Sequence, residues 1–133
     1  MLRSRSRSPD EGSTTLEIAI LGPVLLLLIF AIVQAALWFY ARNLALAAAQ
    51  EGVGAGRAYG SNPSQGVSRA RSFLDRSASD SLQGSSVSSA GSTPSTVRIS
   101  VTGRSLSVLP GFAGITVTQS AVGPVERFST ATP

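Results

Sequence analysis

Histidine, cysteine and lysine are all absent from this sequence of 133 residues. Their absence excludes disulfides, imidazole and thiolate metal ligands, catalytic arrangements that need histidine, and Schiff-base lysines. Charged residues are also scarce, at 14% of the chain, whereas 43% of the residues are apolar. We therefore expect no enzyme, no metal or other cofactor and no small-molecule substrate, and room for one small domain.

The charge pattern argues against nucleic acid as a partner. All 11 basic residues are arginines and stand against 7 acids, so the net charge is only +4. The arginines are not interleaved with aromatic residues, as they are in many nucleic-acid-binding segments. We therefore expect no nucleic-acid binding.

The longest apolar run covers residues 18–40 and reads IAILGPVLLLLIFAIVQAALWFY, with no charge and a single amide, Gln34. As a helix it would extend about 34 Å, enough to cross a hydrocarbon core of about 30 Å. The run predicts one transmembrane helix. The alternative, a core helix covered on all sides, would need more apolar sequence than the rest of the chain provides.

The arginines near this run predict its orientation. Arg3, Arg5 and Arg7 precede the run, and only Arg42 follows it closely. By the positive-inside rule, the N-terminus lies in the cytoplasm and the C-terminal part lies outside. The sequence thus predicts a single-pass protein of the cytoplasmic (inner) membrane.

Aromatic residues close the run at its C-terminal end. Trp38, Phe39 and Tyr40, followed by Arg42, predict an anchor at the outer membrane interface. A cleaved secretory signal is the alternative, because residues 45–47 read Ala-Leu-Ala and offer an A-x-A cleavage pattern. The apolar run is, however, longer than the roughly 7–15 residues of a signal-peptide core.

A glycine and a carboxylate stand five positions apart just before the run, at Gly12 and Glu17. An acid at the edge of the hydrocarbon is costly unless it is paired. One interpretation is a capping box, in which Thr14 and Glu17 satisfy free amides in the first turn of a helix. That interpretation leaves Gly12 and the basic leader unexplained.

A basic leader that ends in glycine, a glutamate at the fifth position after it and about 20 apolar residues resemble the class III signal peptide of the type IV pilin superfamily. The resemblance implies that a prepilin peptidase cuts between Gly12 and Ser13 on the cytoplasmic side, and that Glu17 guides subunit assembly. The new α-amine of Ser13 would then lie about one helical turn from a neighbouring subunit's Glu17, close enough to pair with it.

Pro23 interrupts the hydrogen bonding of the predicted helix and is expected to kink or locally unwind it. The resemblance to pilins implies that such a proline gives flexibility during assembly. Ordinary helix geometry without a function is the alternative.

Four features in order carry a narrower resemblance over residues 12–54: Leu16-Glu17, Pro23, the aromatic exit at 38–42, and an alanine-rich stretch that ends in Glu51-Gly52. Together they resemble the TadE-like pilus-assembly proteins, pseudopilins of the tight adherence (Tad) system. The resemblance implies a minor pilin or pseudopilin of a Tad-type pilus or related secretion apparatus. Its partners would be prepilin peptidase, other pilin subunits, Tad assembly proteins and the membrane. The alternative is an uncleaved, signal-anchored envelope protein whose exported domain binds an extracellular partner.

The helix continues beyond the membrane segment. Ala41, Ala45 and Ala49 recur every four residues and predict a stripe for close packing against another subunit, unless alanine serves only as a helix former here. Three glycines follow, each costing about 1 kcal/mol relative to alanine in a helix, so the helix should end near residues 52–57.

The remaining sequence predicts a small α+β domain. After a turn at 61–64, apolar residues at helical spacing from Val67 to Leu82 predict a short amphipathic helix. Residues 77–95 are rich in serine and glycine and predict a partly disordered loop. Alternation at 96–102 and 115–118, with a further strand at 105–109 and a turn at Pro110-Gly111, predicts two or three antiparallel strands.

The expected organisation has three parts: a cytoplasmic leader (1–12), a transmembrane and extended helix (13–57) and an extracytoplasmic domain (58–133). Only 17 of the 74 residues from 60 to 133 are large and apolar. A core of that size is marginal without partners. We therefore expect a subunit that assembly stabilises.

Overall fold

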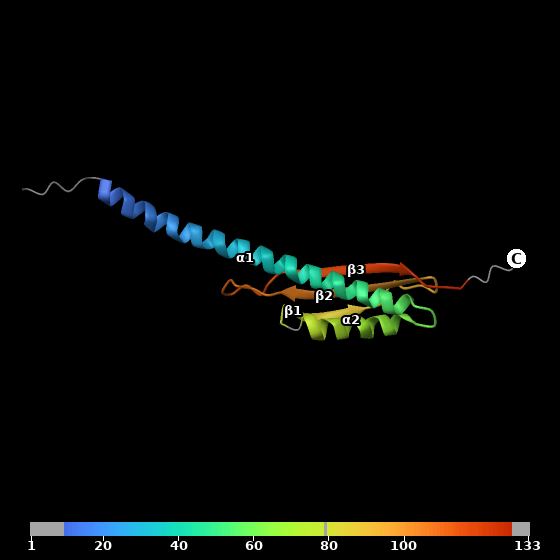
Figure 1. Ribbon diagram of the computed structural model, residues 1–133. Helices are drawn as coiled ribbons and strands as arrows, with labels where there is room; N and C mark the ends of the chain where they lie inside the picture. Colours follow the sequence, from blue (N-terminus) through green and yellow to red (C-terminus); the bar gives the residue numbers. More distant parts are fainter. Residues whose placement is uncertain (1–9, 79, 129–133) are drawn as a thin grey trace, which may run out of the picture.

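The computed structural model describes residues 10–78 and 80–128, so the leader arginines Arg3, Arg5 and Arg7 lie outside the described residues. It contains two helices and three strands: α1 (Asp10–Arg57), α2 (Pro63–Ser77), β1 (Leu82–Ser88), β2 (Thr96–Ser105) and β3 (Thr116–Pro124). This α+β fold, with one long and one short helix and a small antiparallel sheet, confirms the fold class expected from the sequence (Figure 1).

The sheet is antiparallel with the order β1-β2-β3, and both helices cover the same face of it. Burial alternates along β2, as expected for a strand with one face in the core and one in solvent. On the solvent face, hydroxyl pairs join β2 to β3: Ser100 Oγ to Ser120 Oγ and Thr102 Oγ1 to Thr118 Oγ1, each at 3.2 Å. The fold is therefore a two-layer sandwich with a polar outer sheet face.

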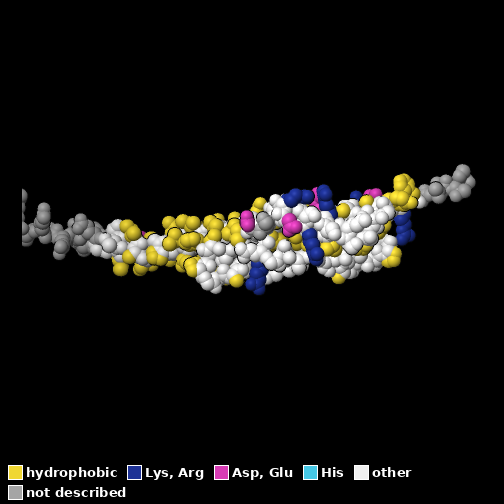
Figure 2. Space-filling view, turned by 90° about the horizontal axis from the view of Figure 1, so that it is seen from below, with side chains coloured by type: hydrophobic (Ala, Val, Ile, Leu, Met, Phe, Trp, Pro, Cys, Tyr) yellow, Lys and Arg dark blue, Asp and Glu magenta, His cyan; other side chains and the backbone are white. Residues whose placement is uncertain are grey.

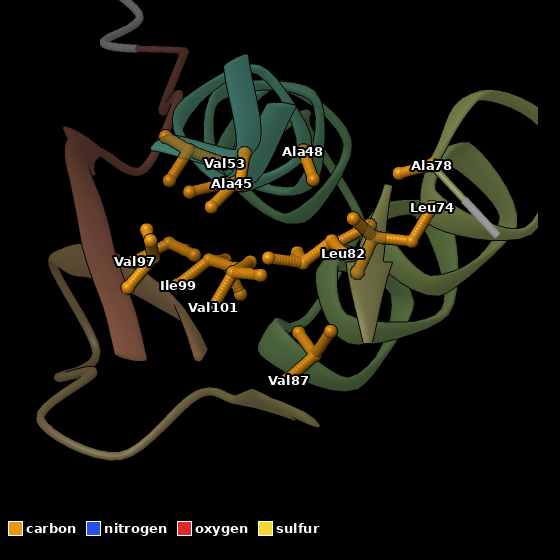
Figure 3. Packing of buried hydrophobic residues seen from close by; sticks show 14 residues of the cluster. Ala45, Ala48, Val53, Leu74, Ala78, Leu82, Val87, Val97, Ile99 and Val101 are labelled. Atoms are coloured by element: carbon orange, nitrogen blue, oxygen red, sulfur yellow. The ribbon is translucent and has the colours of Figure 1, made fainter. Parts of the chain in front are cut away.

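The hydrophobic core lies between β2 and the C-terminal half of α1. Val97, Ile99 and Val101 of β2 are fully buried. Figure 3 shows them facing Ala45 and Val53 of α1. The core thus extends across the expected boundary at residues 57/58, and the small domain includes the last turns of the long helix.

Helix α2 begins where the chain changes from the predicted turn to an apolar stripe. Asn62 is the N-cap, because its Oδ1 accepts a hydrogen bond from the Gln65 amide at 3.1 Å, and Pro63 occupies the first helical position, where no donor is needed. Its buried residues, Gly66, Ala70 and Leu74, face the core. The helix ends at Ser77, so the prediction that it extends to Leu82 is wrong.

The loop predicted at 77–95 is also wrong, because this segment contains β1. Leu82 and Val87 are buried and anchor the strand, while the residues between them are exposed, so serines are tolerated there. The pairing with β2 shifts register between Gln83 and Ser86, where Gly84 has a φ of 57°. The third strand is therefore β1, and not the predicted strand at 105–109.

Residues 106–115 form the connection between β2 and β3, which we call the β2–β3 loop. Its tip is a turn in which the Phe112 amide donates to the Leu109 carbonyl at 3.2 Å. Gly111 has a φ of 75°, as position i+2 of a type II turn requires after a proline, so the predicted Pro110-Gly111 turn is confirmed. The buried Ser105 closes the base, since its amide donates to the Ile115 carbonyl at 3.0 Å and its hydroxyl accepts from the Ile115 amide at 3.1 Å.

Candidate functional site along the first helix

The N-terminal half of α1 projects beyond the domain and is apolar and exposed. Every described large hydrophobic side chain from Leu16 to Val33 is exposed. The 18 consecutive residues of the helix with the highest mean hydropathy reach a value of 2.8, and none of them is buried within the chain. These 18 residues rise about 27 Å, close to the thickness of a hydrocarbon core. Figure 2 shows the hydrophobic side chains along this half and the charged ones gathered over the domain. The expected alternative of a buried core helix is therefore wrong for this segment.

Gly12, Ser13 and Glu17 all lie exposed on α1. A Cβ at Gly12 would meet nothing within 4 Å, so packing does not explain the glycine. Among the described residues, the ion pairs join Arg57 to Glu126 and Arg69 to Glu51, and Glu17 takes part in neither. Because α1 already begins at Asp10, Thr14 lies inside the helix and is not its N-cap, so the capping-box interpretation is wrong.

The structure shows no interruption of α1 at Pro23. The helix is continuous from Asp10 to Arg57, with Pro23 inside it. The expected local unwinding is therefore wrong, since a helix of this length loses only a little of its hydrogen bonding at one proline, whereas the expected kink stays a prediction. A role for Pro23 in assembly stays a prediction.

Gln34 marks the point where α1 enters the domain. Its side chain is 6% exposed, its Nε2 donates to the Leu106 carbonyl at 3.0 Å, and its Oε1 accepts from the Val108 amide at 3.1 Å. The side-chain amide of Gln34 thereby binds two backbone groups of the β2–β3 loop, which lie 72 and 74 residues away in sequence. The sequence pattern alone assigns Gln34 no role. The available signal was that a lone polar side chain in an apolar run needs a partner.

Replacing Gln34 with leucine should loosen the β2–β3 loop. The substitution keeps the size of the side chain but leaves the Leu106 carbonyl and the Val108 amide without their partner, at a cost of about 1–3 kcal/mol. We expect the Val108 amide of the full chain in detergent to exchange its hydrogen at least about fivefold faster than in the natural chain. Gln50→Leu, at an exposed glutamine of the same helix, is the control, and equal exchange rates in both variants would contradict this role.

The four predicted anchor residues follow Gln34 by about one to two turns. Trp38 is partly buried against the core, while Phe39 and Tyr40 remain about half exposed. The Arg42 guanidinium lies 5.9 Å from the centroid of the Trp38 ring, and the Trp38 and Phe39 rings pack edge to face at 4.9 Å. The contacts of the domain with α1 therefore begin at Gln34, about one turn before these four residues. Their position at the membrane interface stays a prediction.

The alanine stripe lies inside the chain's own core. Ala41, Ala45 and Ala49 are fully buried in the cluster that α1 forms with α2 and the sheet. Their small side chains permit a close approach, but the partner is the same chain and not another subunit as expected. A secretory cut after Ala47 would also remove Ala41 and Ala45 from this core.

Glycines bring the backbones of α1 and α2 into direct contact. A Cβ at Gly52 would lie 2.8 Å from the Gly66 carbonyl oxygen, and a Cβ at Gly66 would lie 2.6 Å from that of Gly52. Next to this crossing, Arg69 Nε of α2 pairs with Glu51 Oε2 of α1 at 3.2 Å. The Glu51-Gly52 pair therefore has a structural role that was not predicted from the sequence, although glycines four residues apart, at 52 and 56, signal close helix packing.

These observations define a class of protein: a small α+β domain built onto the C-terminal half of one long helix whose N-terminal half is apolar, as in a single-pass membrane protein. Residues 12–53 match the TadE-like protein family. That segment, about a third of the chain, is thus TadE-like, as the sequence features indicated. No curated protein and no solved structure matches the chain.

Proposed function

We propose that this chain is a minor pilin or pseudopilin of a Tad-type pilus or a related secretion apparatus. The observation that carries the proposal is the family match, which begins at Gly12 and ends at Val53. It therefore covers the glycine of the cleavage motif, Glu17, the exposed apolar span and the Glu51-Gly52 contact with α2.

In the proposed mechanism, prepilin peptidase cuts between Gly12 and Ser13 on the cytoplasmic side. The cut creates an α-amine at Ser13, and Glu17 of an adjacent subunit pairs with it at the edge of the membrane. Each charge is costly to hold there alone, and each is compensated by the other only in the assembly. The exposure of Glu17 and of the apolar side chains that follow it supports this role, because both are accessible to neighbouring helices.

The architecture of the domain is also compatible with assembly through α1. The domain packs on the helix from Gln34 onward, so it leaves the segment from Leu16 to Val33 uncovered. That segment is free to pass between lipid and a bundle of similar helices, while the domain keeps its own core. The proposal needs no partner to complete the fold.

The processing step is tested by intact mass spectrometry of the chain extracted from membranes of cells with a Tad system. We expect a product that begins at Ser13, and we expect Gly12→Leu to abolish it. Gly22→Leu is the matched control, because Gly22 is also an exposed glycine of α1 with nothing within 4 Å of an added Cβ. An intact N-terminus in the natural chain would contradict the proposal and favour the uncleaved signal anchor, and a product that begins after Ala47 would indicate ordinary secretion.

A further inference from the structure

The β2–β3 loop is apolar and exposed. No charged residue occurs between Arg104 and Glu126. Phe112 is 44% exposed and Ile115 is 40% exposed, and Leu109 is only partly buried. A surface loop of this composition needs an explanation, because connections between strands are usually polar.

The loop lies at the end of the domain nearest the apolar half of α1 (Figure 1). Its backbone is bound to Gln34, which directly follows the exposed segment that ends at Val33. Gln34 precedes Trp38 by about 6 Å and Arg42 by about 12 Å along the helix axis. If the four predicted anchor residues lie at the membrane interface, the loop lies closer to the centre of the bilayer than they do. If Gln34 lies at the interface, the loop lies at the depth of the interface.

Several backbone groups of the loop are hydrogen-bonded within the chain, which lowers the cost of placing them where water is scarce. Unsatisfied backbone groups are costly in lipid. Here Gln34 binds the Leu106 carbonyl and the Val108 amide, and Ser107 Oγ accepts a hydrogen bond from the Leu109 amide at 3.2 Å. The Leu109 carbonyl accepts from Phe112, and both backbone groups of Ile115 bind Ser105. These bonds satisfy seven backbone groups of the loop, and the other groups can bind water or headgroups in the interfacial layer.

We propose that the β2–β3 loop inserts into the interfacial layer of the bilayer that α1 spans, in the leaflet that faces the domain. Phe112 and Ile115 contact the lipid, and the two hydrogen bonds of Gln34 fix the depth of the loop against the helix. Lipid is the occupant because the loop, with its exposed apolar side chains, is bound at Gln34 next to the exposed apolar segment of α1, and because Arg104 at its base suits anionic headgroups. The inference requires only that α1 spans a membrane, and it is independent of processing or a pilus.

Single cysteines test this proposal cleanly, because the chain has none of its own. Ala113→Cys places an environment-sensitive fluorophore at the tip of the loop and keeps Phe112. Ala90→Cys is the matched control: it is also an exposed alanine, in the β1–β2 connection at the opposite end of the sheet. Leu26→Cys reports on the middle of the span. The full chain is reconstituted in vesicles of phosphatidylcholine and phosphatidylglycerol.

We expect the label at position 113 to emit at a shorter wavelength than the label at position 90. We also expect lipids that carry a spin label near the headgroup to quench it. Its quenching by aqueous iodide should be at least about fivefold weaker than at position 90. Equal iodide quenching at the two positions would overturn the proposal, as would a label at position 26 that iodide reaches. Protection that grows with the protein-to-lipid ratio without lipid quenching would overturn it in favour of a second copy of the chain. None of these results depends on cleavage after Gly12, so the proposed function is tested separately.

Discussion

Replacing Glu17 with glutamine should leave the chain in the membrane and reduce its co-isolation with pilus subunits at least about tenfold. The substitution keeps the shape of the side chain but removes the charge that would pair with the Ser13 α-amine of a neighbour. Removing one partner of a poorly solvated ion pair costs about 3–5 kcal/mol, and about 1.4 kcal/mol already corresponds to a factor of ten in affinity. Membrane extraction followed by affinity capture of a tagged chain measures the effect.

Glu51→Gln is the control for this experiment. Glu51 is another exposed acid of α1, but it pairs with Arg69 of its own chain, and an exposed pair of this kind contributes only about 0–1 kcal/mol. We therefore expect normal co-isolation for Glu51→Gln. Undiminished recovery of pilus subunits with Glu17→Gln would exclude the charge pairing as the basis of assembly, even if processing at Gly12 occurs.

The second large effect concerns the crossing of α1 and α2. Gly52→Ala adds a methyl group 2.8 Å from the Gly66 carbonyl oxygen, so the two backbones must move apart. Overpacking of this kind costs about 1–3 kcal/mol and exceeds the gain in helix propensity of about 1 kcal/mol. We expect a net loss of up to about 2 kcal/mol in the free energy of unfolding, measured for the full chain in detergent by the fluorescence of Trp38, which packs against the core.

Gly54→Ala makes the same chemical change on the same helix two residues away. Nothing lies within 4 Å of an added Cβ at Gly54, so only the gain in helix propensity, about 1 kcal/mol, remains. The two variants should therefore change stability in opposite directions. Equal stability of both variants would show that the helices do not meet at Gly52.

The main elements could be predicted from local patterns. The apolar run and the glycines after Glu51 predict a long helix that ends near Arg57, where α1 does end. Alternation predicts β2 and β3, because each strand has a buried face and a polar face. Strand β1 was missed, because only Leu82 and Val87 are buried and the register shift between them breaks the alternation.

The source of the core could not be predicted from local patterns. Counting large apolar residues after residue 60 made the domain look marginal, because the count left out the part of α1 that packs against it. Alanine is compatible with a surface helix, a contact between subunits and a tight core. Only the tertiary packing assigns Ala41 and Ala45 to the core. Likewise, the two partners of Gln34 lie more than 70 residues away in sequence, beyond the reach of any helical or strand periodicity.

The unbroken course of α1 through Pro23 into the core couples rotation of the membrane segment to the sheet. Sliding such a helix by one residue along a neighbour moves it by about 1.5 Å and turns it by about 100°. The same slip would swing the polar face of the sheet through about a quarter of a turn. In an assembly of such helices, the depth of the first turns of α1 in the membrane would therefore set the direction in which the polar sheet face of each domain points.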